Sequence, residues 1–294
     1  MNKNILVTGI EGFIGSNLAL RAAKSNLNVI GLSREKENWD AVEYINKLKK
    51  ITKNKKFESV VHFGAIASTR IIDEKIIHGF NVEAVEIIAN FCSQTDTPLI
   101  FASSAAIYGN KNNSLSYYAE TKLKGESILK DTRNLRFTAL RLFNTYGFNE
   151  IGKNEMKSFI SDAIISGLLR KKILIWKFND LKIGSQSRDF VHVSDVNKTI
   201  LKLIYKSRYL NEILDLGSGQ SYKFIDIANL IKALDKDVEI ESTDPPAGYD
   251  KSYYQQYTCA NVSWLKLFND GIEPKNPFEV IPELAKHYKK YFKK

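Results

Sequence analysis

The segment that most constrains the fold lies near the amino terminus, where an apolar run leads through a glycine-rich turn into a helix-forming stretch. Residues 5–8 are typical of a buried parallel strand, and glycines follow at Gly9, Gly12 and Gly15. Glycine allows a tight turn and close approach of backbone to phosphate, and the helix that follows offers free N–H donors at the positive end of its dipole. The segment therefore predicts a pyrophosphate-binding turn. An ordinary strand-to-helix turn is the alternative, because the G-x-x-G-x-x-G spacing is one residue longer than the usual G-x-G-x-x-G.

A second pattern, Y-x-x-x-K, places Tyr118 and Lys122 on one face of an expected helix. Tyrosine has a reference pKa of about 10, so lowering it by about three units requires about 4 kcal/mol of phenolate stabilisation. A lysine ammonium and the positive ring of an oxidised nicotinamide would supply this. Upstream, Ser103-Ser104 ends the apolar run of residues 99–102, where ligands meet α/β sheets. The three patterns in this order predict a dehydrogenase-type site.

Further segments extend the pattern along the chain: HFGA at residues 62–65, LRLFNTYG at 140–147, RDFVHVSDV at 188–196 and LDLGSG at 214–219. With them the chain resembles, nearly end to end, the extended short-chain dehydrogenase/reductase superfamily of NAD(P)-dependent nucleotide-sugar epimerases and dehydratases. The resemblance implies an α/β fold with a Rossmann-type doubly wound parallel sheet and a smaller, discontinuous α/β substrate domain. We expect the NADP-binding domain over residues 1–146 plus about 187–212, and the substrate-binding domain over about 147–186 and 213–294.

Periodicity predicts the elements of these domains. We expect strands at 4–8, 28–32, 59–63, 98–102 and 137–142, and helices near 13–25, 40–53, 80–94 and 117–131. Later elements are a helix at 224–234, a strand at 237–241 and a helix at 278–292. Between residues 34 and 58 the chain is short for the superfamily, with no counterpart of the third strand and the Asp-hydrophobic pair that hold adenine.

The second strand ends at Ser33-Arg34, without the acidic residue that favours NAD. Ser33 can bond a phosphate and Arg34 can pair with it as a charge-assisted fork. We therefore predict NADP(H), with NAD as the alternative if Arg34 is only surface charge. The complete set of residues expected at the cofactor is Gly9, Gly12, Phe13, Ile14, Gly15, Ser33, Arg34, Phe63, Gly64, Ala65, Asn81, Tyr118 and Lys122.

The residues after Ser104 bear on the reaction. Dehydratases of the superfamily carry an acid–base pair there, whereas this chain has Ala105-Ala106, so dehydration is not expected. The ADP-L-glycero-D-manno-heptose 6-epimerases resemble the chain better, because they carry a Lys and a Met in register with Lys153 and Met156. Their Ser-Thr pair and Tyr-Gln-x-aromatic-Thr segment match Ser68-Thr69 and residues 254–258. The chain departs from their pattern at Phe148-Asn149 and at Tyr253.

The resemblance implies two bases, Tyr118 and Lys153, one removing the C6″ hydroxyl proton as hydride leaves and the other acting as acid on its return. Ser104 would bond the reacting oxygen, and the catalytic set is Ser104, Tyr118, Lys122 and Lys153. The substrate-binding set is Ser68, Thr69, Ser104, Asn144, Met156, Arg188 and Tyr254. A nucleotide-sugar 4-epimerase or 4-keto-sugar reductase is one alternative, and a non-catalytic NADP-binding regulator is another.

Composition narrows the partners. The net charge is +10, but the lysines are scattered, so we expect no nucleic acid; the excess would help attract an anionic nucleotide-diphosphate sugar. Two cysteines and four histidines without ligand spacing predict no metal. No charged-then-apolar leader and no run of roughly 20 apolar residues is present, so we expect a cytoplasmic enzyme without membrane association. The superfamily usually self-associates, which implies a homo-oligomer.

Overall fold

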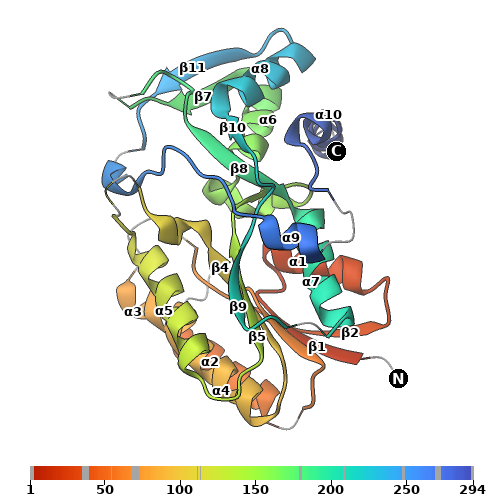
Figure 1. Ribbon diagram of the computed structural model, residues 1–294. Coiled ribbons are helices and arrows are strands. Elements are labelled where there is room, and N and C mark those ends of the chain that lie inside the picture. The colour runs from red at the N-terminus through yellow and green to blue at the C-terminus, as the bar shows by residue number, and fades with distance from the viewer. Residues whose placement is uncertain are drawn as a thin grey trace. The chain divides into compact units, whose positions relative to one another are not determined.

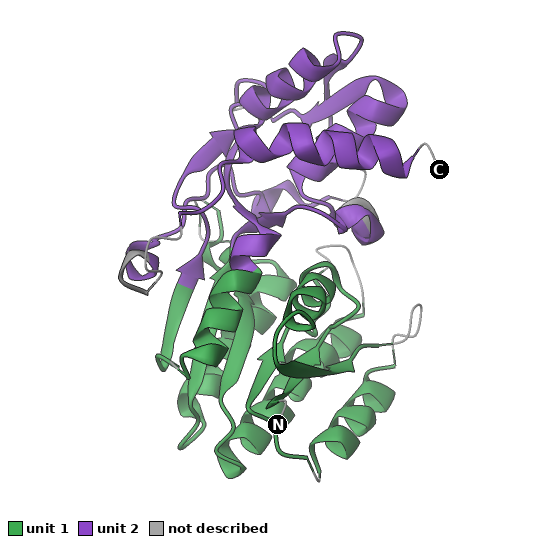
Figure 2. Cartoon of the chain, turned by 90° about the vertical axis from the view of Figure 1, so that its right-hand side faces the viewer, with its two compact units in different colours: residues 1–142, 197–214 green, residues 143–196, 215–294 purple. Residues whose placement is uncertain are grey.

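A computed structural model of the chain describes residues 3–34, 40–53, 55–67, 73–110, 112, 114–178, 181–207, 209–246, 249–268 and 273–292. The chain divides into two compact units (Figure 2). Unit 1 comprises Met1–Leu142 and Asn197–Leu214, and unit 2 comprises Phe143–Val196 and Asp215–Lys294. Residues 187–196, which we had grouped with the nucleotide-binding part, fall in unit 2. The reason is that strand β8 (Ser187–His192) pairs with unit 2 strands on both sides.

Unit 1 is built on a six-stranded sheet in the order β2-β1-β3-β4-β5-β9 (Figure 1). The strands are β1 (Lys3–Thr8), β2 (Leu27–Leu32), β3 (Ser59–His62), β4 (Leu99–Ser104), β5 (Phe137–Leu142) and β9 (Glu212–Leu216). The pairs from β2 through β5 are all parallel. Strands β1, β3, β4 and β5 are largely buried on both faces, which explains why they are apolar runs in the sequence.

Helices cover both faces of this sheet, as Figure 1 shows. They are α1 (Phe13–Ala22), α2 (Ala41–Thr52), α3 (Glu74–His78), α4 (Ala84–Gln94), α5 (Tyr117–Asp131) and α7 (Val193–Tyr205), the last entering unit 1 at Asn197. In α2 the buried Tyr44, Leu48 and Thr52 recur every fourth residue and form one face. The helix begins where the Asp40 carboxylate accepts a hydrogen bond from the Glu43 N–H.

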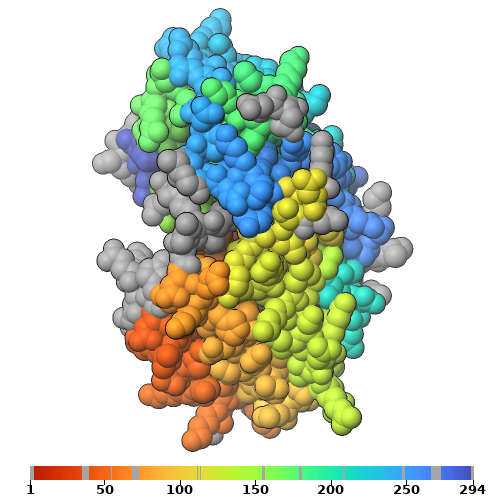
Figure 3. Space-filling model, turned by 90° about the vertical axis from the view of Figure 1, so that its left-hand side faces the viewer, coloured from red at the N-terminus to blue at the C-terminus, as the bar shows by residue number. Residues whose placement is uncertain are grey.

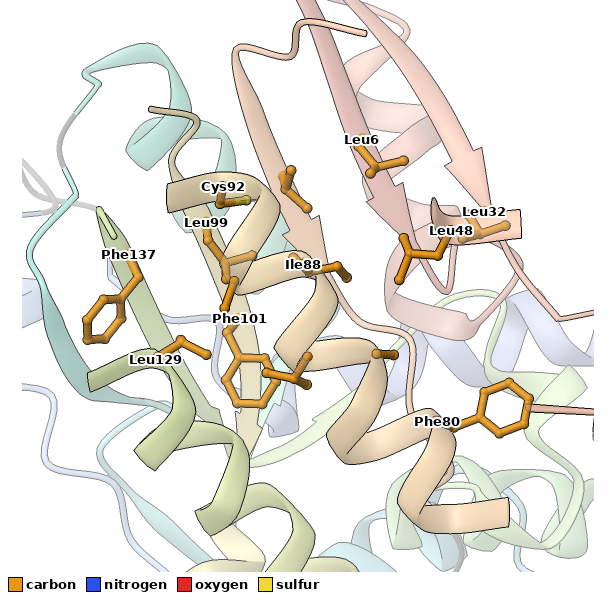
Figure 4. Close-up of a cluster of buried hydrophobic side chains, with 14 of the residues drawn as sticks. Leu6, Leu32, Leu48, Phe80, Ile88, Cys92, Leu99, Phe101, Leu129 and Phe137 are labelled. Carbon is orange, nitrogen blue, oxygen red and sulfur yellow. The ribbon is translucent and has the colours of Figure 1, made fainter. Parts of the chain in front are cut away.

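One apolar cluster joins α2, α4 and α5 to the sheet (Figure 4). Leu48, Ile88 and Leu129 come from the helices, and Leu99 and Phe101 come from β4. Burying each such side chain contributes roughly 1.5–3 kcal/mol, so this packing fixes the helices on the sheet more strongly than their intrinsic propensities. On the face of unit 1 shown in Figure 3, the short α3 lies beside α5.

The strand order locates the ligand-binding edge of unit 1. Strand β2 lies on one side of β1 and β3 on the other, so the chain reverses direction across the sheet at β1. In doubly wound sheets ligands bind at this switch point, beyond the carboxyl ends of the strands. In the part of the chain that the structure describes, β2 is the edge strand. The strand that lies outside it in the order 3-2-1-4-5-6 is absent there, as the short segment after Arg34 predicts.

A π-helical turn, Gly79–Glu83, joins α3 to α4. The sequence predicts ordinary helix from residue 80, so this turn was missed. A Cβ on Gly79 would lie 2.6 Å from the Cβ of Ala41, so glycine lets this turn approach α2 closely. Such turns are frequent at functional sites, and this one carries the buried Asn81.

Unit 2 contains a three-stranded sheet in the order β10-β8-β6 and a parallel pair, β11-β7. Its strands are β6 (Asn144–Tyr146), β7 (Lys172–Trp176), β8 (Ser187–His192), β10 (Ser221–Lys223) and β11 (Glu239–Thr243). Its helices are α6 (Phe159–Arg170), α8 (Phe224–Leu234), α9 (Ser263–Phe268) and α10 (Pro277–Tyr291). A second apolar cluster, with Ile164, Ile227 and Leu284 among its members, holds α6, α8 and α10 together.

Candidate active site

The glycine turn after β1 is packed too tightly for side chains. Gly9 has a φ of +68°, and a Cβ on it would lie 2.9 Å from the backbone nitrogen of Gly64. A Cβ on Gly15 would collide with the carbonyl oxygen of Gly9. Two backbones, from the ends of β1 and β3, therefore approach each other at the switch point, and both positions require glycine.

Helix α1 begins within this turn, at Phe13, and is well suited to bind an anion. Its N-cap residue is Gly12, which supplies no side-chain capping bond. The first N–H groups of a helix lack intrahelical acceptors and lie at the positive end of its dipole. With Ile14 and Gly15 in that first turn, a diphosphate fits the residues present, as dinucleotide binding requires.

The loop after β3 is tied to the end of β1. The Phe63 N–H donates to the Thr8 carbonyl at 3.2 Å, and the Gly64 N–H donates to the Thr8 hydroxyl at 3.1 Å. This holds Phe63, Gly64 and the partly buried Ala65 beside the glycine turn. The structure thus brings together two segments that we assigned to the cofactor from separate parts of the sequence.

Ser33 follows β2 and also reaches the glycine turn. Its Oγ accepts a hydrogen bond from the Glu11 N–H at 3.0 Å, which leaves the hydroxyl hydrogen available for a phosphate oxygen. Arg34 comes next and is exposed. Ser33 is therefore tied to the glycine turn, and Arg34 is the next residue along the chain.

Ser104, Tyr118 and Lys122 converge from β4 and α5. Helix α5 begins at Tyr117, where the Ser116 hydroxyl caps it by accepting from the Ala119 N–H, so Tyr118 lies in its first turn. Tyr118 is hydrogen-bonded to Ser104. The Lys122 Nζ lies 5.9 Å from the centre of the Tyr118 ring and donates to the Ala102 carbonyl at 2.8 Å. The three residues expected to act together are therefore assembled.

Burial dominates the pKa values of this group. It raises the pKa of Tyr118, and the hydrogen bond with Ser104 acts in the opposite direction. Burial lowers the pKa of Lys122 to about 7, against the attraction of Glu126. The predicted lowering of the Tyr118 pKa includes the charge of an oxidised nicotinamide and stays a prediction.

A buried carboxylate that the sequence analysis missed stands one helical turn beyond Lys122. Glu126 accepts hydrogen bonds from the Ser103 hydroxyl at 2.5 Å and from Arg141 Nε and Nη2 at 2.9 and 2.8 Å. The sequence pattern could have identified it, because Glu126 follows Lys122 by four residues, as Lys122 follows Tyr118, and so lies on the same helix face.

Asn81, which we expect near the cofactor, bonds to the backbone and to a side chain of unit 1. Its Oδ1 accepts from the Ile66 N–H at 2.7 Å, and its Nδ2 donates to the Ile66 carbonyl and to Thr121 Oγ1 at 3.1 and 3.0 Å. Both amide donors are therefore used inside unit 1. Asn81 ties the loop after β3 to α5, close to Tyr118, whose carbonyl accepts from Thr121.

In unit 2, Lys153 stands on a 3₁₀ turn, Glu150–Met156, that a buried carboxylate anchors. Glu150 is fully buried and accepts from the Ser158 N–H at 2.6 Å and from the Ser158 and Ser161 hydroxyls at 2.9 and 2.5 Å. Lys153 Nζ donates to the same carboxylate at 3.3 Å. Met156 ends the turn and is exposed. The sequence analysis predicted Lys153 and Met156 but missed Glu150.

Arg188, on β8, is a buried cation held mainly by aromatic rings. Its guanidinium carbon lies 4.9 Å from the Tyr254 ring centre and 5.7 Å from that of Phe224, and its Nη1 donates to the Ser187 carbonyl at 3.0 Å. Tyr254 in turn stacks on Phe178 at 4.1 Å. Among the residues that the structure describes, no carboxylate pairs with Arg188. Burial lowers its pKa, so this site would gain from an anionic partner.

The residue after Arg188 explains how the surrounding loops are held. Asp189 is fully buried and accepts backbone N–H bonds from Ser218, Gly219 and Ala260 at 2.7, 2.9 and 3.0 Å. The sequence analysis did not predict this role. It joins the loop after β9 to the segment after Tyr254.

The remaining predicted residues are placed as follows. Asn144 is the first residue of β6, is partly buried and is paired with Phe190. Ser68 and Thr69 lie outside the described residues. Within the described ranges, no group of three or more His, Cys, Asp or Glu side chains could hold a metal ion. No helix in that part of the chain is long and apolar enough to span a bilayer.

Comparison with known proteins agrees with this geometry. The model of a family described as the NAD dependent epimerase/dehydratase family matches residues 5–217. An ADP-L-glycero-D-manno-heptose-6-epimerase of Brachyspira hyodysenteriae is 27% identical over 308 residues, covering 89% of this chain and 90% of that protein. One of Alkalilimnicola ehrlichii is 30% identical over 302 residues, covering 90% and 93%.

Among solved structures, the Helicobacter pylori ADP-L-glycero-D-manno-heptose-6-epimerase matches with a TM-score of 0.82 at 23% identity, covering 97% of this chain and 96% of that one. This shows a common fold and confirms the Rossmann-type α/β architecture. The family match spans the glycine turn, Ser104, Tyr118, Lys122 and Arg188. The chain therefore belongs to the NAD-dependent epimerase/dehydratase family, the extended short-chain dehydrogenase/reductase enzymes.

Proposed function

We propose that this enzyme is an NADP-dependent epimerase that inverts C6″ of an ADP-linked heptose or a closely similar nucleotide sugar. The names of the two relatives above and the residues in register with them support the sugar. The observation that carries the proposal is Lys153, a second candidate base held on a built turn by the buried Glu150. When hydride leaves one face of a carbon and returns to the other, the oxygen on that carbon is presented in two directions, and two proton-transfer groups can serve it.

The first proton transfer is assigned to Tyr118. Ser104, hydrogen-bonded to Tyr118, would bond the reacting hydroxyl and direct it to the phenolic oxygen. Lys122 would stabilise the phenolate through its charge. The glycine turn and the start of α1 would hold the dinucleotide, whose nicotinamide would supply hydride transfer from and back to the substrate carbon.

The second proton is assigned to Lys153. After oxidation the substrate carbon is a carbonyl, and epimerisation requires that its opposite face receive the hydride. Lys153 would then supply the proton to the oxygen, as Tyr118 accepted one before. Its Nζ lies 3.3 Å from the Glu150 carboxylate, a contact that helps to hold the side chain on the turn.

Dehydration has no support from the residues after Ser104. Ala105 and Ala106 form a short 3₁₀ turn there, capped by the Ser104 oxygen, which accepts from the Ala106 N–H at 3.1 Å. Neither side chain can transfer a proton. This favours epimerisation or reduction among the reactions of the family.

Recognition of the two ligands is assigned to separate sets of residues. Ser33 and Arg34 would take the 2′-phosphate that distinguishes NADP from NAD. Arg188 would pair with the substrate diphosphate, because it is a buried guanidinium without a carboxylate among the described residues. Asn144, Met156 and the Ser68-Thr69 pair complete the proposed substrate set, with Tyr254 stacked on Arg188.

The experiment incubates the purified enzyme with NADP⁺ and ADP-L-glycero-D-manno-heptose and follows the C6″ epimer by proton NMR. We expect interconversion without net change in nicotinamide absorbance. Stoichiometric consumption of NADPH would instead identify a reductase of a keto sugar. Tight cofactor binding without turnover of any such sugar would favour the non-catalytic regulator.

Lys153→Met separates the two-base reaction from others. We expect turnover to fall about 10²-fold while NADP binding is retained. Lys172→Met is the matched control, because the exposed Lys172 side chain pairs with Glu241 between β7 and β11. Turnover of Lys153→Met within tenfold of the unmodified enzyme would contradict the role of Lys153. Light scattering of the same preparations tests the expected homo-oligomer.

A further inference from the structure

Glu126 is a carboxylate buried beside the proposed proton-transfer group without touching the reacting atoms. It is 4% exposed, and the Ser103 hydroxyl and the Arg141 guanidinium satisfy its oxygens. A buried carboxylate is costly unless it is paired and hydrogen-bonded. The three hydrogen bonds that Glu126 accepts therefore indicate that unit 1 stabilises a buried negative charge at this position.

Glu126 is coupled to Lys122 in two ways. It lies one turn along the same face of α5, and its negative charge opposes the effect of burial on the pKa of Lys122. In addition, Lys122 donates to the carbonyl of Ala102, and the next residue on β4, Ser103, donates to Glu126. The carboxylate thus acts on both the charge and the anchoring strand of the lysine.

Arg141 determines how much negative charge Glu126 presents. Its guanidinium binds the carboxylate through two nitrogens, and Nη1 donates to the Tyr108 hydroxyl at 3.0 Å. The guanidinium also lies 5.1 Å from the Tyr108 ring centre. A bidentate pair of this kind is strong and geometrically fixed. Lys122, Glu126 and Arg141 therefore form a row with charges of plus, minus and plus.

Other elements near Lys122 contribute little charge. From β3, His62 faces it, but burial lowers the His62 pKa to about 3 and keeps the ring neutral. The π-helical turn presents the Asn81 amide to Thr121. From α3, Glu74 acts on Tyr117, the neighbour of Tyr118. Helix α4 meets α5 through the apolar cluster of Figure 4.

We propose that Glu126 is a positioning residue that acts through Lys122, holding its ammonium protonated and in place, and that Arg141 sets the strength of this action. The assignment rests on the proposed role of Tyr118 and Lys122 in proton transfer, but not on the identity of the sugar. Removing the negative charge of Glu126 destabilises the Lys122 cation and, with it, the Tyr118 anion that this cation would stabilise. Removing the positive charge of Arg141 does the reverse.

Neutralising Glu126 and neutralising Arg141 should therefore shift the pH titration of Tyr118 in opposite directions. The readout is the tyrosinate absorbance of Tyr118 in the NADP⁺-bound protein, taken as the difference from Tyr118→Phe in the same background and titrated with pH. Glu126→Gln should move this titration to higher pH by about 1 unit, and Arg141→Gln should move it to lower pH by about 1 unit. Lys124→Gln, which removes an exposed charge from the same helix, is the matched control and should leave the titration in place.

A merely structural role predicts a different result. Both substitutions break the same buried pair, so both would lower the unfolding temperature while the Tyr118 titration stays unmoved or shifts in one common direction. Either outcome overturns the proposal. Glu126→Asp and Arg141→Lys retain the charges, and we expect them to keep the titration close to that of the unmodified protein. If the glutamine variants do not fold, a shift of 1 unit or more in both conservative variants overturns it equally.

The design keeps this proposal separate from the proposed function. The absorbance titration needs NADP⁺ but no sugar. If the heptose is not a substrate, the opposite shifts are still expected; if it is a substrate and the shifts are absent, only the role of Glu126 is wrong.

Discussion

The two units hold their candidate residues in different ways. In unit 1, Ser104 ends a central strand, and Tyr118 and Lys122 lie on a long helix packed against it. In unit 2, Lys153 stands on a short turn, and Tyr254 follows another. Backbone geometry thus fixes the proton-transfer group of unit 1, whereas side-chain contacts fix the residues of unit 2.

The units also treat buried charge differently. In unit 1 the Lys122 ammonium has Glu126 one turn away, and Glu126 is paired with Arg141. In unit 2 the described residues offer Arg188 aromatic rings and a carbonyl instead of a carboxylate. A balanced set can tune proton transfer, whereas a cation packed among rings retains affinity for an anion. Under the proposed function, unit 1 therefore carries the first proton transfer, whereas unit 2 combines the second, at Lys153, with recognition of the diphosphate at Arg188.

The strongest test of this division removes the phenol of unit 1. Tyr118→Phe should reduce turnover about 10³-fold because the base is lost, while NADP binding is retained. Steady-state kinetics and fluorescence titration of the cofactor measure the two effects. Tyr117→Phe is the control, since the Tyr117 hydroxyl donates to the Glu74 carbonyl at 3.4 Å. If the Tyr118→Phe enzyme kept more than a tenth of the normal turnover, the assignment of the first proton transfer to Tyr118 would be wrong.

The next largest effect is expected on the stability of unit 2, where Asp189 joins two loops. Asp189→Asn should destabilise the fold by about 3 kcal/mol, because an amide cannot accept all the backbone N–H bonds that the buried carboxylate accepts. Urea unfolding followed by circular dichroism measures the change. Asp237→Asn, at an exposed position, should have almost no effect. An equal loss of stability in the two variants would show that Asp189 does not organise these loops.

Recognition by unit 2 is tested at Arg188. Arg188→Gln should raise KM for the nucleotide sugar about 30-fold and change kcat little, because a charged hydrogen bond to the diphosphate contributes about 2 kcal/mol. Initial rates over a range of substrate concentrations give both constants. Arg170→Gln, exposed at the end of α6, controls for net charge. A fall in kcat at unchanged KM would assign Arg188 to the chemistry rather than to recognition.

The smallest effect is expected at the edge of the glycine turn. Arg34→Ala should weaken NADP⁺ binding about tenfold, the equivalent of about 1.4 kcal/mol, and leave NAD⁺ binding unchanged. Isothermal titration with both cofactors gives the ratio. Lys24→Ala, just beyond α1 and exposed, is the control. Unchanged NADP⁺ affinity would refute the assignment of the phosphate to Arg34.

The same contrast explains what the sequence could predict. The strands and most helices of unit 1 follow from apolar runs and periodicity, and Ser104, Tyr118 and Lys122 lie at fixed positions within them. The π-helical turn at Asn81 could not be predicted, because the close approach of Gly79 to Ala41 that it accommodates is a tertiary contact. The rise in the Tyr118 pKa within the protein could not be predicted either, since it is caused by burial rather than by neighbours in sequence.

In unit 2 the sequence identified the residues in register with a family, Lys153 and Arg188, but not what holds them. Glu150 bonds to Ser158 and Ser161 on the next helix, and Asp189 bonds to segments 29 and 71 residues away. A carboxylate on a chain does not reveal whether it will be buried or which N–H groups it will meet. Such contacts arise only when distant loops come together.

The central claim is that hydride leaves and returns to one carbon while Tyr118 and Lys153 move protons on the oxygen. The most direct measurement uses ADP-L-glycero-D-manno-heptose deuterated at C6″, incubated with enzyme and NADP⁺ in ordinary water and examined by NMR and mass spectrometry. The account predicts that both epimers appear and that each keeps the deuterium at C6″. Loss of the label to solvent, its net transfer to the cofactor pool, or the absence of the second epimer would contradict the account.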